Sequence, residues 1–542
     1  MQIYVNQVGY PQNARKVAAA NFPCHFQLIN ALTKQCALDG TARTKGFDDC
    51  SGEEVYQIDF SDVTVPGSYY ILAENGVQSH VFQIGENVYE SLKTAVIKAL
   101  YFQRCGCELT EKHAGVYTHK ACHTTPSVFL DDYINKVPDP QQLDMTGGWH
   151  DAGDFGRYSS PAAVALAHLL YAYELFPDKL QMDLNIPESG NDMPDLLNEC
   201  LYELTWLMKM QAPDGGVYHK LTSFSHAGFI MPEEDSAQFL IYPVSSMATA
   251  DFAAVMALAS RVYAPFRSDF SEQALTAAKK AWSWLDSNPY VGFHNPAGSN
   301  TGEYDDESDL DERLWASAEL LRTDKENAAA YIEKLKEYSA LPISKTDFGW
   351  TDVSGFATLT ILFDPDHSAG DFEADYKKVL FAEADRLCKL QAGSGYQLAM
   401  QPEDFVWGSN MVVCNRSMLL ILASLLSDSI EAAAYREAAL NQLHYLLGRN
   451  AMDTSYVTGF GENAFKNPHN RPTYADGIEL PMPGWVSGGP FKAPCDEAAI
   501  ERIPAGTPPM KCYVDHVDSY STNEITIYWN SPVAFMTAFF SK

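Results

Sequence analysis

The chain has 542 residues, of which 46% are hydrophobic and 20% charged, a composition typical of a globular protein large enough for two domains. Its formal net charge of −32 argues against nucleic acid and anionic membranes as partners. No run of about 18 apolar residues predicts a membrane span, and the first residues lack a basic segment followed by an apolar core. We therefore expect a cytoplasmic protein with reduced cysteines, monomeric or weakly homo-oligomeric; the alternative is a secreted protein whose signal peptide has been removed.

Residues 1–85 contain six short runs of strand-forming residues, each bounded by Gly, Pro, Asn or Asp. Closely spaced runs of this kind predict a small antiparallel sandwich of the immunoglobulin-like type. Polar side chains do not cluster in this part of the sequence, so we interpret it as structural. The six runs are "IYVNQVGY", "KVAAANF", "HFQLINA", "EVYQIDFSDV", "SYYILAENG" and "SHVFQIG".

From residue 88 onward the hydrophobic period becomes helical. Connections after odd-numbered helices are mostly long, and those after even-numbered helices are generally shorter. If neighbouring helices are antiparallel, the long loops share one end of the domain, where function is expected. The pattern predicts that residues 86–542 form six helical hairpins closed into an (α/α)6 barrel. The twelve predicted helices span 88–104, 161–176, 193–211, 245–263, 272–287, 309–322, 325–337, 351–362, 371–391, 409–426, 429–447 and 523–540.

The first long loop contains the stretch "GGWHDAGDFGRY", with two carboxylates at Asp151 and Asp154. One interpretation is a turn followed by the N-cap of the helix near residue 161. A second is a calcium loop, although the spacing does not match the EF-hand pattern. A third is a pair of carboxylates that activates water. The residues of this stretch alone leave the three interpretations open.

The last long loop, "YVDHVDSYSTNEITIYWNSP", places Asp515, Asp518 and Glu524 before the final predicted helix. Glu524 falls in the first turn of that helix, where the helix dipole favours a carboxylate. If Glu524 instead faces the apolar run that follows, burial raises its pKa, as a general acid requires. An ionised Asp paired with such a Glu suits glycoside hydrolysis. The residues available to cap the helix are Ser521, Thr522 and Asn523.

Seven further motifs, after "NQVGY" at the start, occur in order along the chain. With them the sequence resembles glycoside hydrolase family nine over essentially its whole length, in the branch that begins with an immunoglobulin-like domain. The motifs are "GGWHDAGDFGRY", "IPESGNDMPDLLNE", "DERLWASAEL", "VWGSN", "LLGRNAMDTSYVTGFG", "NPHNRP" and "DSYSTNEITIYWN".

This resemblance implies an (α/α)6 catalytic barrel and a reaction that inverts the anomeric carbon. By position, Asp154 is the general base that activates water, Asp151 orients the water, and Glu524 is the general acid. The family commonly has His-His-Arg where this chain has His469-Asn470-Arg471, a departure that puts ordinary cellulose binding in doubt. The expected substrate contacts are His469, Arg471, Trp149, Tyr520, Asp515 and Asp518.

Cysteine and histidine residues gather around the first long loop. Two Cys and two His supply the four tetrahedral ligands of a structural zinc ion, although buried inert thiols are the alternative. The resembled branch often carries such a site. We expect Cys105, Cys122, His123 and His150 as ligands, with Cys107 as a substitute, and a zinc ion that holds the loop without an open position for water.

The acidic loop "NTGEYDDESDLDERLW" is either an exposed acidic surface or a calcium site. By resemblance, the calcium ligands are Gly302, Asp311, Glu312 and Asp352, with Asp305 and Asp306 as additions. We expect no organic cofactor.

Signatures of other enzyme classes, namely Gly-x-Ser-x-Gly, His-Glu-x-x-His, Gly-Lys-Ser/Thr and Cys-x-x-Cys, do not occur. We expect a β-1,4-glycosidase, exo-acting on short soluble gluco- or glucosamine oligosaccharides, because a cytoplasmic enzyme does not meet insoluble cellulose. The acidic balance and Asn470 favour the cationic sugar. The alternatives are an endo-β-1,4-glucanase and a non-catalytic carbohydrate-binding protein of the same fold.

Overall fold

A computed structural model describes residues 1–542 apart from the side chain of Ser429. Its contacts divide the chain into two compact units, which are described separately. Unit 1 comprises Met1–Ala99, Ala382–His469 and Glu479–Lys542. Unit 2 comprises Leu100–Phe381 and Asn470–Ile478.

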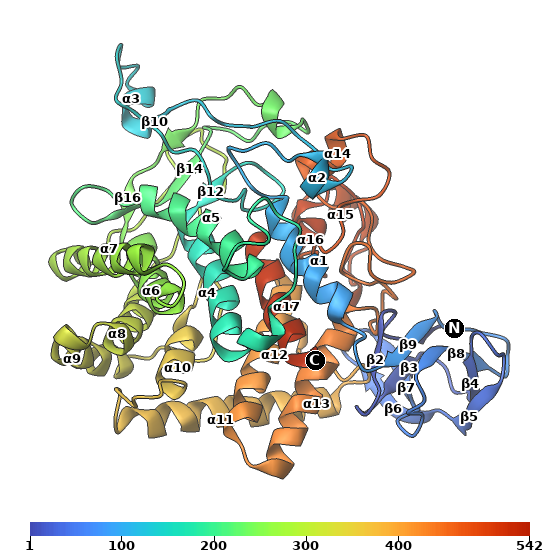
Figure 1. The fold of residues 1–542 in the computed structure, drawn as a ribbon. Helices are drawn as coiled ribbons and strands as arrows, with labels where there is room; N and C mark the ends of the chain where they lie inside the picture. The colour runs from blue at the N-terminus through green and yellow to red at the C-terminus, as the bar shows by residue number, and fades with distance from the viewer. The chain divides into compact units, whose positions relative to one another are not determined.

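The N-terminal part of unit 1 is a β domain with two sheets, as the sequence predicts; its strands are blue in Figure 1. One sheet has the order β1-β3-β7-β6 and the other the order β2-β9-β8-β4-β5. The aromatic rings of Tyr10, Phe60 and Phe82 pack within 5.0–5.3 Å of one another in its core. The strands are β1 Ile3–Tyr4, β2 Gly9–Pro11, β3 Val17–Ala20, β4 His25–Asn30, β5 Cys36–Thr41, β6 Arg43–Asp48, β7 Glu53–Asp59, β8 Gly67–Ala73 and β9 Phe82–Gly85.

The β domain differs from the sequence-based expectation in two places. The predicted run at residues 3–10 is divided between β1 and β2, which belong to different sheets, and β2 pairs with β9 in parallel. Strands β5 and β6 were not predicted. Their side chains are mostly exposed and polar, so they lack the alternation of apolar residues that marks a half-buried strand.

All twelve predicted helices are present, with ends that differ by a few residues. The hydrophobic pattern predicts them because each is a continuous run of nine residues or more whose apolar side chains enter the core. They are α1 Glu90–Tyr101, α4 Ser159–Leu175, α5 Asp195–Lys209, α6 Ser246–Tyr263, α7 Ser268–Ser287, α8 Leu310–Thr323, α9 Ala328–Ser339, α10 Ser354–Leu362, α11 Phe372–Gly393, α12 Ser409–Leu426, α13 Ser429–Leu446 and α17 Ile527–Phe540.

The helices of unit 2 alternate between two kinds of environment. Helices α4 and α6 are buried almost along their whole length, whereas α7 and α9 bury one face. Helix α6 packs against α4, α7 and α8, and α8 packs against α9 and α10. In unit 1, α12 packs against α13 and α17. The consecutive pairs α4–α5, α6–α7, α8–α9 and α12–α13 pack together, as four of the six predicted hairpins require.

The long loops contain short elements that were not predicted, because segments of two to six residues show no reliable period. In unit 2 they include a sheet of order β11-β10-β15-β14-β12 and the pair β13-β16. These strands are β10 Ser127–Phe129, β11 Gln142–Leu143, β12 Arg157–Tyr158, β13 Val217–Tyr218, β14 Lys220–Thr222, β15 Leu240–Ile241 and β16 Val244–Ser245. The short helices are α2 Glu111–Ala114, α3 Leu130–Ile134, α14 Arg471–Ala475, α15 Glu497–Arg502 and α16 Tyr520–Asn523, and the 3-10 turns are Pro177–Lys179, Pro232–Glu234, Lys325–Asn327, Pro402–Asp404 and Pro509–Lys511.

Helix α12 is, contrary to the expectation from sequence, long and apolar enough to cross a membrane by length and composition. About two thirds of it (67%) is buried inside the protein, and a core helix of a soluble protein meets the same criterion.

Candidate active site

The loop that carries Asp151 and Asp154 is held by hydrogen bonds to its main chain and to Trp149. Trp149 donates its indole N–H to Glu199 Oε1 at 2.9 Å and its backbone N–H to Glu203. Gly148 has φ +79°, and a Cβ there would lie 2.7 Å from the Trp206 ring, so the turn requires glycine. The loop is therefore rigid and backed by α5.

Asp151 is a buried carboxyl, 1% exposed. The Tyr304 hydroxyl donates to its Oδ2 at 2.6 Å, and Oδ1 has no hydrogen-bond partner among the described residues. Burial raises the pKa of Asp151 well above its ordinary value; the Tyr304 hydrogen bond opposes this rise and the charge of Asp154 adds to it. Oδ1 is thus a buried oxygen available to a water molecule or a substrate.

Asp154, 7% exposed, has the opposite electrostatic environment. Its Oδ2 lies 2.7 Å from Nδ1 of His226, and its Oδ1 accepts a hydrogen bond from Gly156 N at 3.3 Å. Burial opposes ionisation, but His226 and the charge of Arg471 outweigh it and lower the pKa of Asp154. Asp151 thus favours its neutral form and Asp154 its ionised form, so Asp154 is the member of the pair suited to act as a base.

The interpretation of this stretch as a turn with a helix N-cap is wrong. The N-cap position of α4 is Tyr158, and no side chain caps the helix there. The aspartates bond instead to Tyr304 and His226, from other parts of unit 2. Neither partner was predicted, because Tyr304 lies within the acidic loop and nothing in the sequence marks His226.

Arg471, a predicted substrate contact, supports the loop of Asp154. Its guanidinium donates to Gly153 O and to Ala227 O, at 2.9 Å each. The preceding residue, Asn470, is 1% exposed and caps α14, its Oδ1 accepting from Thr473 N at 3.0 Å. Asn470 therefore has a structural role, and its effect on sugar binding stays a prediction.

Glu524 lies in unit 1 together with His469. The two residues form a parallel β-bridge, and the imidazole Nδ1 of His469 donates to Val517 O at 2.6 Å. Helix α17 starts at Ile527 and is capped by Thr526, so Glu524 lies in extended backbone before the helix. Two predictions are thus wrong: Glu524 does not lie in the first turn of the helix, and Ser521, Thr522 and Asn523 do not cap it. The reason is that Thr526 is the N-cap.

An exposed aromatic surface adjoins these residues in unit 1. The rings of Trp407 and Tyr520 lie 5.5 Å apart, and Tyr520 lies 5.9 Å from His469. Trp407 is 44% exposed and Tyr520 is 36% exposed, so both rings are accessible. Tyr520 was predicted as a sugar contact, and Trp407 was missed although it occurs in the motif "VWGSN".

Other predicted substrate contacts have structural roles. Trp149 is only 1% exposed and offers no face to a sugar. The Asp515 carboxylate accepts hydrogen bonds from Lys466 N and Asn467 N at 2.8 Å each, which fixes the chain before His469. Asp518 is exposed and lies 3.6 Å from His516.

The predicted zinc ligands of unit 2 converge, each offering one atom within 4.8 Å of the others. Cys105 Sγ lies 4.0 Å from Cys122 Sγ and 3.5 Å from His123 Nδ1, and His150 Nε2 lies 3.4 Å from His123 Nδ1. Ligands at 2.0–2.3 Å around one tetrahedral ion are separated by about 3.3–3.8 Å, so this donor set fits zinc. Cys107 is not in the group.

The environment of these ligands also suits a metal ion. Burial opposes ionisation of the Cys105 thiol, but Cys122, Arg157, His150 and His123 outweigh it and lower its pKa. The other ring nitrogen of His123, Nε2, lies 3.4 Å from Asp235 Oδ2, and this contact orients the ring. All eleven cysteines are free thiols.

The predicted calcium ligands fit less well. Glu312 and Asp311 are buried, and burial raises the pKa of Asp311 to about 6, with Asp352 adding to the rise. Asp352 Oδ1 already accepts from Ser354 N at 3.0 Å. The Gly302 carbonyl accepts a hydrogen bond from the Lys220 ammonium at 2.6 Å, which argues against Gly302 as a calcium ligand because two cations would share one oxygen.

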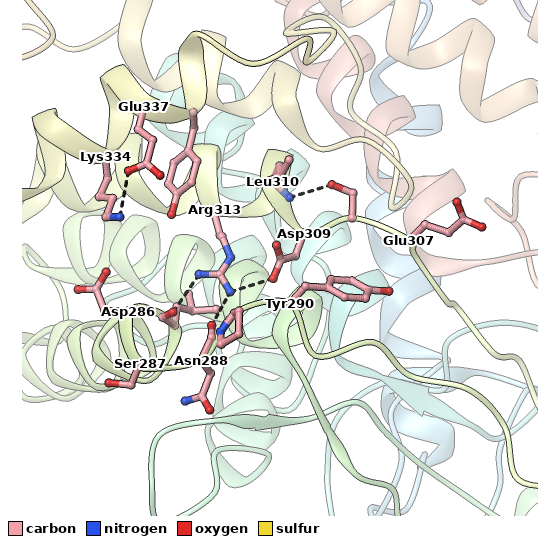
Figure 2. A pocket seen from close by; sticks show the side chains of 14 residues that line it. Asp286, Ser287, Asn288, Tyr290, Glu307, Asp309, Leu310, Arg313, Lys334 and Glu337 are labelled. Carbon is pink, nitrogen blue, oxygen red and sulfur yellow. Dashed lines mark hydrogen bonds and ion pairs between the residues drawn. The ribbon is translucent and has the colours of Figure 1, made fainter.

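A cavity of about 550 Å³ in unit 2 lies between the ends of α7, α8 and α9 and contains none of the predicted site residues (Figure 2). Arg313 points into it, donating to Leu285 O and Asn288 O at 2.9 Å and pairing with Asp309 at 2.9 Å. Lys334 pairs with Glu337 at 3.0 Å. Arg313 thus joins α8 to the end of α7, whereas the Lys334–Glu337 pair lies within α9.

Comparisons with known proteins cover the whole chain. The model of the cellulase N-terminal ig-like domain matches residues 1–78, and that of glycosyl hydrolase family 9 matches residues 89–537. A cellodextrinase from Butyrivibrio fibrisolvens is 42% identical over 551 aligned residues, covering 98% of each chain. A solved single-mutant thermostable endoglucanase from Alicyclobacillus acidocaldarius is 35% identical, with TM-score 0.91 over 100% of this chain and 99% of the other.

A second solved structure, a zinc-binding triple mutant of the family 9 endoglucanase J30, is 32% identical with TM-score 0.91 and covers 98% of this chain and all of its own (100%). The catalytic match spans more than half of the chain, and it includes both the aspartate loop of unit 2 and the Glu524 segment of unit 1. The chain belongs to glycosyl hydrolase family 9 and is an O-glycosyl hydrolase that carries an N-terminal immunoglobulin-like domain.

Proposed function

We propose that this protein is an inverting hydrolase that removes units from the ends of short soluble β-1,4-linked oligosaccharides. The observation that carries the proposal is the contrast between Asp154, held ionised by His226, and Asp151, a buried carboxyl with an unpartnered oxygen. Residues 1–85 form the immunoglobulin-like domain and residues 86–542 the catalytic domain in this proposal. In this proposal the helical hairpins of the catalytic domain close into an (α/α)6 barrel.

In the proposed reaction, the Asp154 carboxylate takes a proton from a water molecule that Asp151 Oδ1 orients. The water oxygen bonds to the anomeric carbon while the bond from that carbon to the leaving oxygen breaks, and Glu524 protonates the leaving oxygen. In inverting enzymes the acid and base stand about 6.5–9.5 Å apart to admit the water. The product of a β-linkage is therefore first released as the α-anomer.

Substrate binding is proposed for the accessible aromatic surface of Trp407 and Tyr520 beside His469. Exposed rings supply flat apolar faces for pyranose rings, and the buried Arg471 acts by holding the main chain of the Asp154 loop. The calcium site at Asp311, Glu312 and Asp352 and the cytoplasmic location stay predictions.

Short chains are favoured as substrates because the relative with 42% identity is named a cellodextrinase. Action inside long glucans is the second candidate, supported by the endoglucanase name of the solved relative. The glucosamine alternative rests on the net charge of −32 and on Asn470, which also caps a helix.

One experiment tests reaction and chain-length preference together. Proton NMR and chromatography would follow products from cellotetraose, diglucosamine and carboxymethylcellulose. We expect an initial α-anomer and stepwise shortening of cellotetraose; an initial β-anomer would disprove inversion, and faster action on carboxymethylcellulose would disprove exo action. Preference for diglucosamine would select the cationic sugar.

Variants in the same assay test the residue roles. Asp154→Asn and Glu524→Gln should each lower kcat by about 10²–10⁴-fold with little change in folding, because each removes a proton-transfer group. The matched control is Asp366→Asn, an exposed carboxylate paired with Lys325, which should leave kcat unchanged. Near-normal activity in either active-site variant would remove that assignment.

A further inference from the structure

Lys220 on β14 is a fully buried lysine in unit 2, with 0% exposure. Its ammonium group has three N–H donors, and three neutral oxygens accept them. These are Asn295 Oδ1 at 2.6 Å, Gly302 O at 2.6 Å and Thr301 Oγ1 at 3.1 Å. The Asn295 side chain also donates to Thr301 O at 2.7 Å. The ammonium therefore ties both ends of the segment 295–302 to the strand.

Aromatic rings enclose the rest of this ammonium group. Its nitrogen lies 4.5 Å from the ring centre of Tyr242, 5.2 Å from that of Phe293 and 5.7 Å from that of Tyr158. Ring faces attract a cation, but a buried charge still loses its hydration. Burial accordingly lowers the pKa of Lys220 to about 7, although Asp154 and Glu303 oppose the shift. An apolar side chain in this space would not lose the hydration free energy that the ammonium group loses on burial. A buried charge here therefore requires a functional explanation.

The segment that Lys220 holds leads directly to Tyr304. His219 directly precedes Lys220 in the chain, and its Nε2 lies 2.8 Å from Glu303 O. His219 and Lys220 therefore bind the carbonyl oxygens of two consecutive residues, Glu303 and Gly302. Tyr304 follows with φ +50°, a left-handed conformation that a tyrosine adopts only when its surroundings enforce it. The hydrogen bonds to the carbonyls of Gly302 and Glu303 hold the backbone before Tyr304 in this conformation.

Tyr304 in turn reaches the carboxyl group of Asp151, to which it donates at 2.6 Å. Tyr158 contacts both Tyr304 and Asp154: its ring lies 4.8 Å from the ring of Tyr304, and its hydroxyl lies 3.5 Å from Asp154 Oδ2. A Cβ on Gly302 would lie 3.1 Å from the Tyr304 ring, so the segment is closely packed against it. The contacts thus run without interruption from Lys220 to both aspartates.

We propose that Lys220 is a positioning residue for the reaction: its ammonium is an internal cation that holds residues 295–302 so that Tyr304 bonds to Asp151. This inference rests on the proposed function. In this proposal the oxygens around Gly302 bind the ammonium group of Lys220 and not a metal ion. Loss of the ammonium should release Tyr304 and act on Asp151 only through that residue.

A double-mutant cycle tests the proposal on the full chain at pH 6, with cellotetraose as substrate. Lys220→Met should lower kcat by about 10–100-fold and change KM less than about threefold, because the effect falls on positioned catalytic groups. In a Tyr304→Phe background, Lys220→Met should change kcat by less than about threefold. Lys325→Met, at an exposed lysine paired with Asp366, is the matched control and should match the wild type.

Multiplicative losses in the double variant, or an unchanged kcat for Lys220→Met, would overturn the proposal. If Lys220→Met does not fold, Lys220→Arg takes its place in the cycle, with the same non-additivity expected. Lys220→Ala gives an independent measure: ammonium chloride should restore part of kcat, whereas tetramethylammonium chloride, which has no N–H donor, should not. An inactive wild type would count against the proposed function instead, so the two failures are distinguishable.

Discussion

His226 sets the charge state of Asp154. The contact of 2.7 Å and the Arg471 charge together overcome the burial of the carboxyl and lower its pKa. A general base must be ionised to act, so the lowered pKa suits the role proposed for Asp154. Asp151, three residues earlier, has no cationic partner and is held by the neutral Tyr304 hydroxyl.

Replacing His226 should therefore move the acid limb of activity. In His226→Asn the carboxylate of Asp154 loses its main stabilising partner, so its pKa rises and the acid limb of kcat/KM shifts upward by roughly one pH unit. The measurement is kcat/KM on cellotetraose between pH 3 and 8. His294→Asn, at an exposed histidine paired with Glu303, is the control. A downward shift, or no shift, would show that His226 does not govern Asp154.

At the scale of elements, the loop of residues 147–158 combines His150, a proposed zinc ligand, with Asp151 and Asp154, the aspartates proposed to act in catalysis. His150 N donates to Gln103 O at 2.7 Å, and the side chain of Gln103 donates to Ala152 O at 2.8 Å. The end of α1 and the Cys105 segment thereby fix the same loop. A zinc ion bound there would stabilise the folded loop, since ligands in an unfolded chain are not arranged to bind it.

Zinc removal should consequently weaken the fold as well as activity. We expect about one zinc per chain by metal analysis, and a melting temperature several degrees lower after dialysis against a strong chelator, restored by added zinc. Cys122→Ser should lose the metal, whereas Cys107→Ser should keep it, because Cys107 lies outside the convergent group. Stoichiometric zinc in Cys122→Ser would refute this ligand set.

At the scale of the whole chain, distant segments of unit 1 are joined by polar contacts. His80, between β8 and β9, lies 3.0 Å from Asp453 and 2.8 Å from Glu462. Hydrogen bonds with these carboxylates raise the pKa of His80 to about 9 against the effect of burial. Burial raises the pKa of Asp453 and so opposes its ionisation, which offsets part of the stabilisation that the contact with His80 provides. The pair ties the β domain to the chain that follows α13.

This contact predicts how stability depends on pH. A histidine whose pKa rises on folding stabilises the protein fully below its unfolded pKa of about 6.5, and the contribution disappears as pH rises through about 9. His80→Gln should thus lower the free energy of unfolding by at most about 3 kcal/mol at pH 6, and the difference should vanish near pH 10. Thermal melts of both proteins at each pH measure this.

The control for that experiment is His25→Gln, at an exposed pair with Asp39, where little change is expected at any pH. A constant difference between His80→Gln and the wild type across this pH range would contradict the linkage.

The sequence determined the twelve helices, the early strands and the positions of Asp151, Asp154 and Glu524, because hydrophobic periods and ordered motifs are local properties of the chain. Residue type and the family resemblance also grouped Cys105, Cys122, His123 and His150 as proposed zinc ligands, and the structure confirms that these four residues converge. The sequence did not predict β5 and β6, whose exposed side chains carry no period.

Only the tertiary structure decided what surrounds those positions. Asn470 became a helix cap and Trp149 a buried support, while Tyr304, His226 and Lys220 came to the aspartates from other loops and strands. Burial and hydrogen bonding depend on side chains that meet across long stretches of sequence. The residues that set protonation and position at this site are therefore fixed by packing, whereas the residues proposed to react could be named from the chain alone.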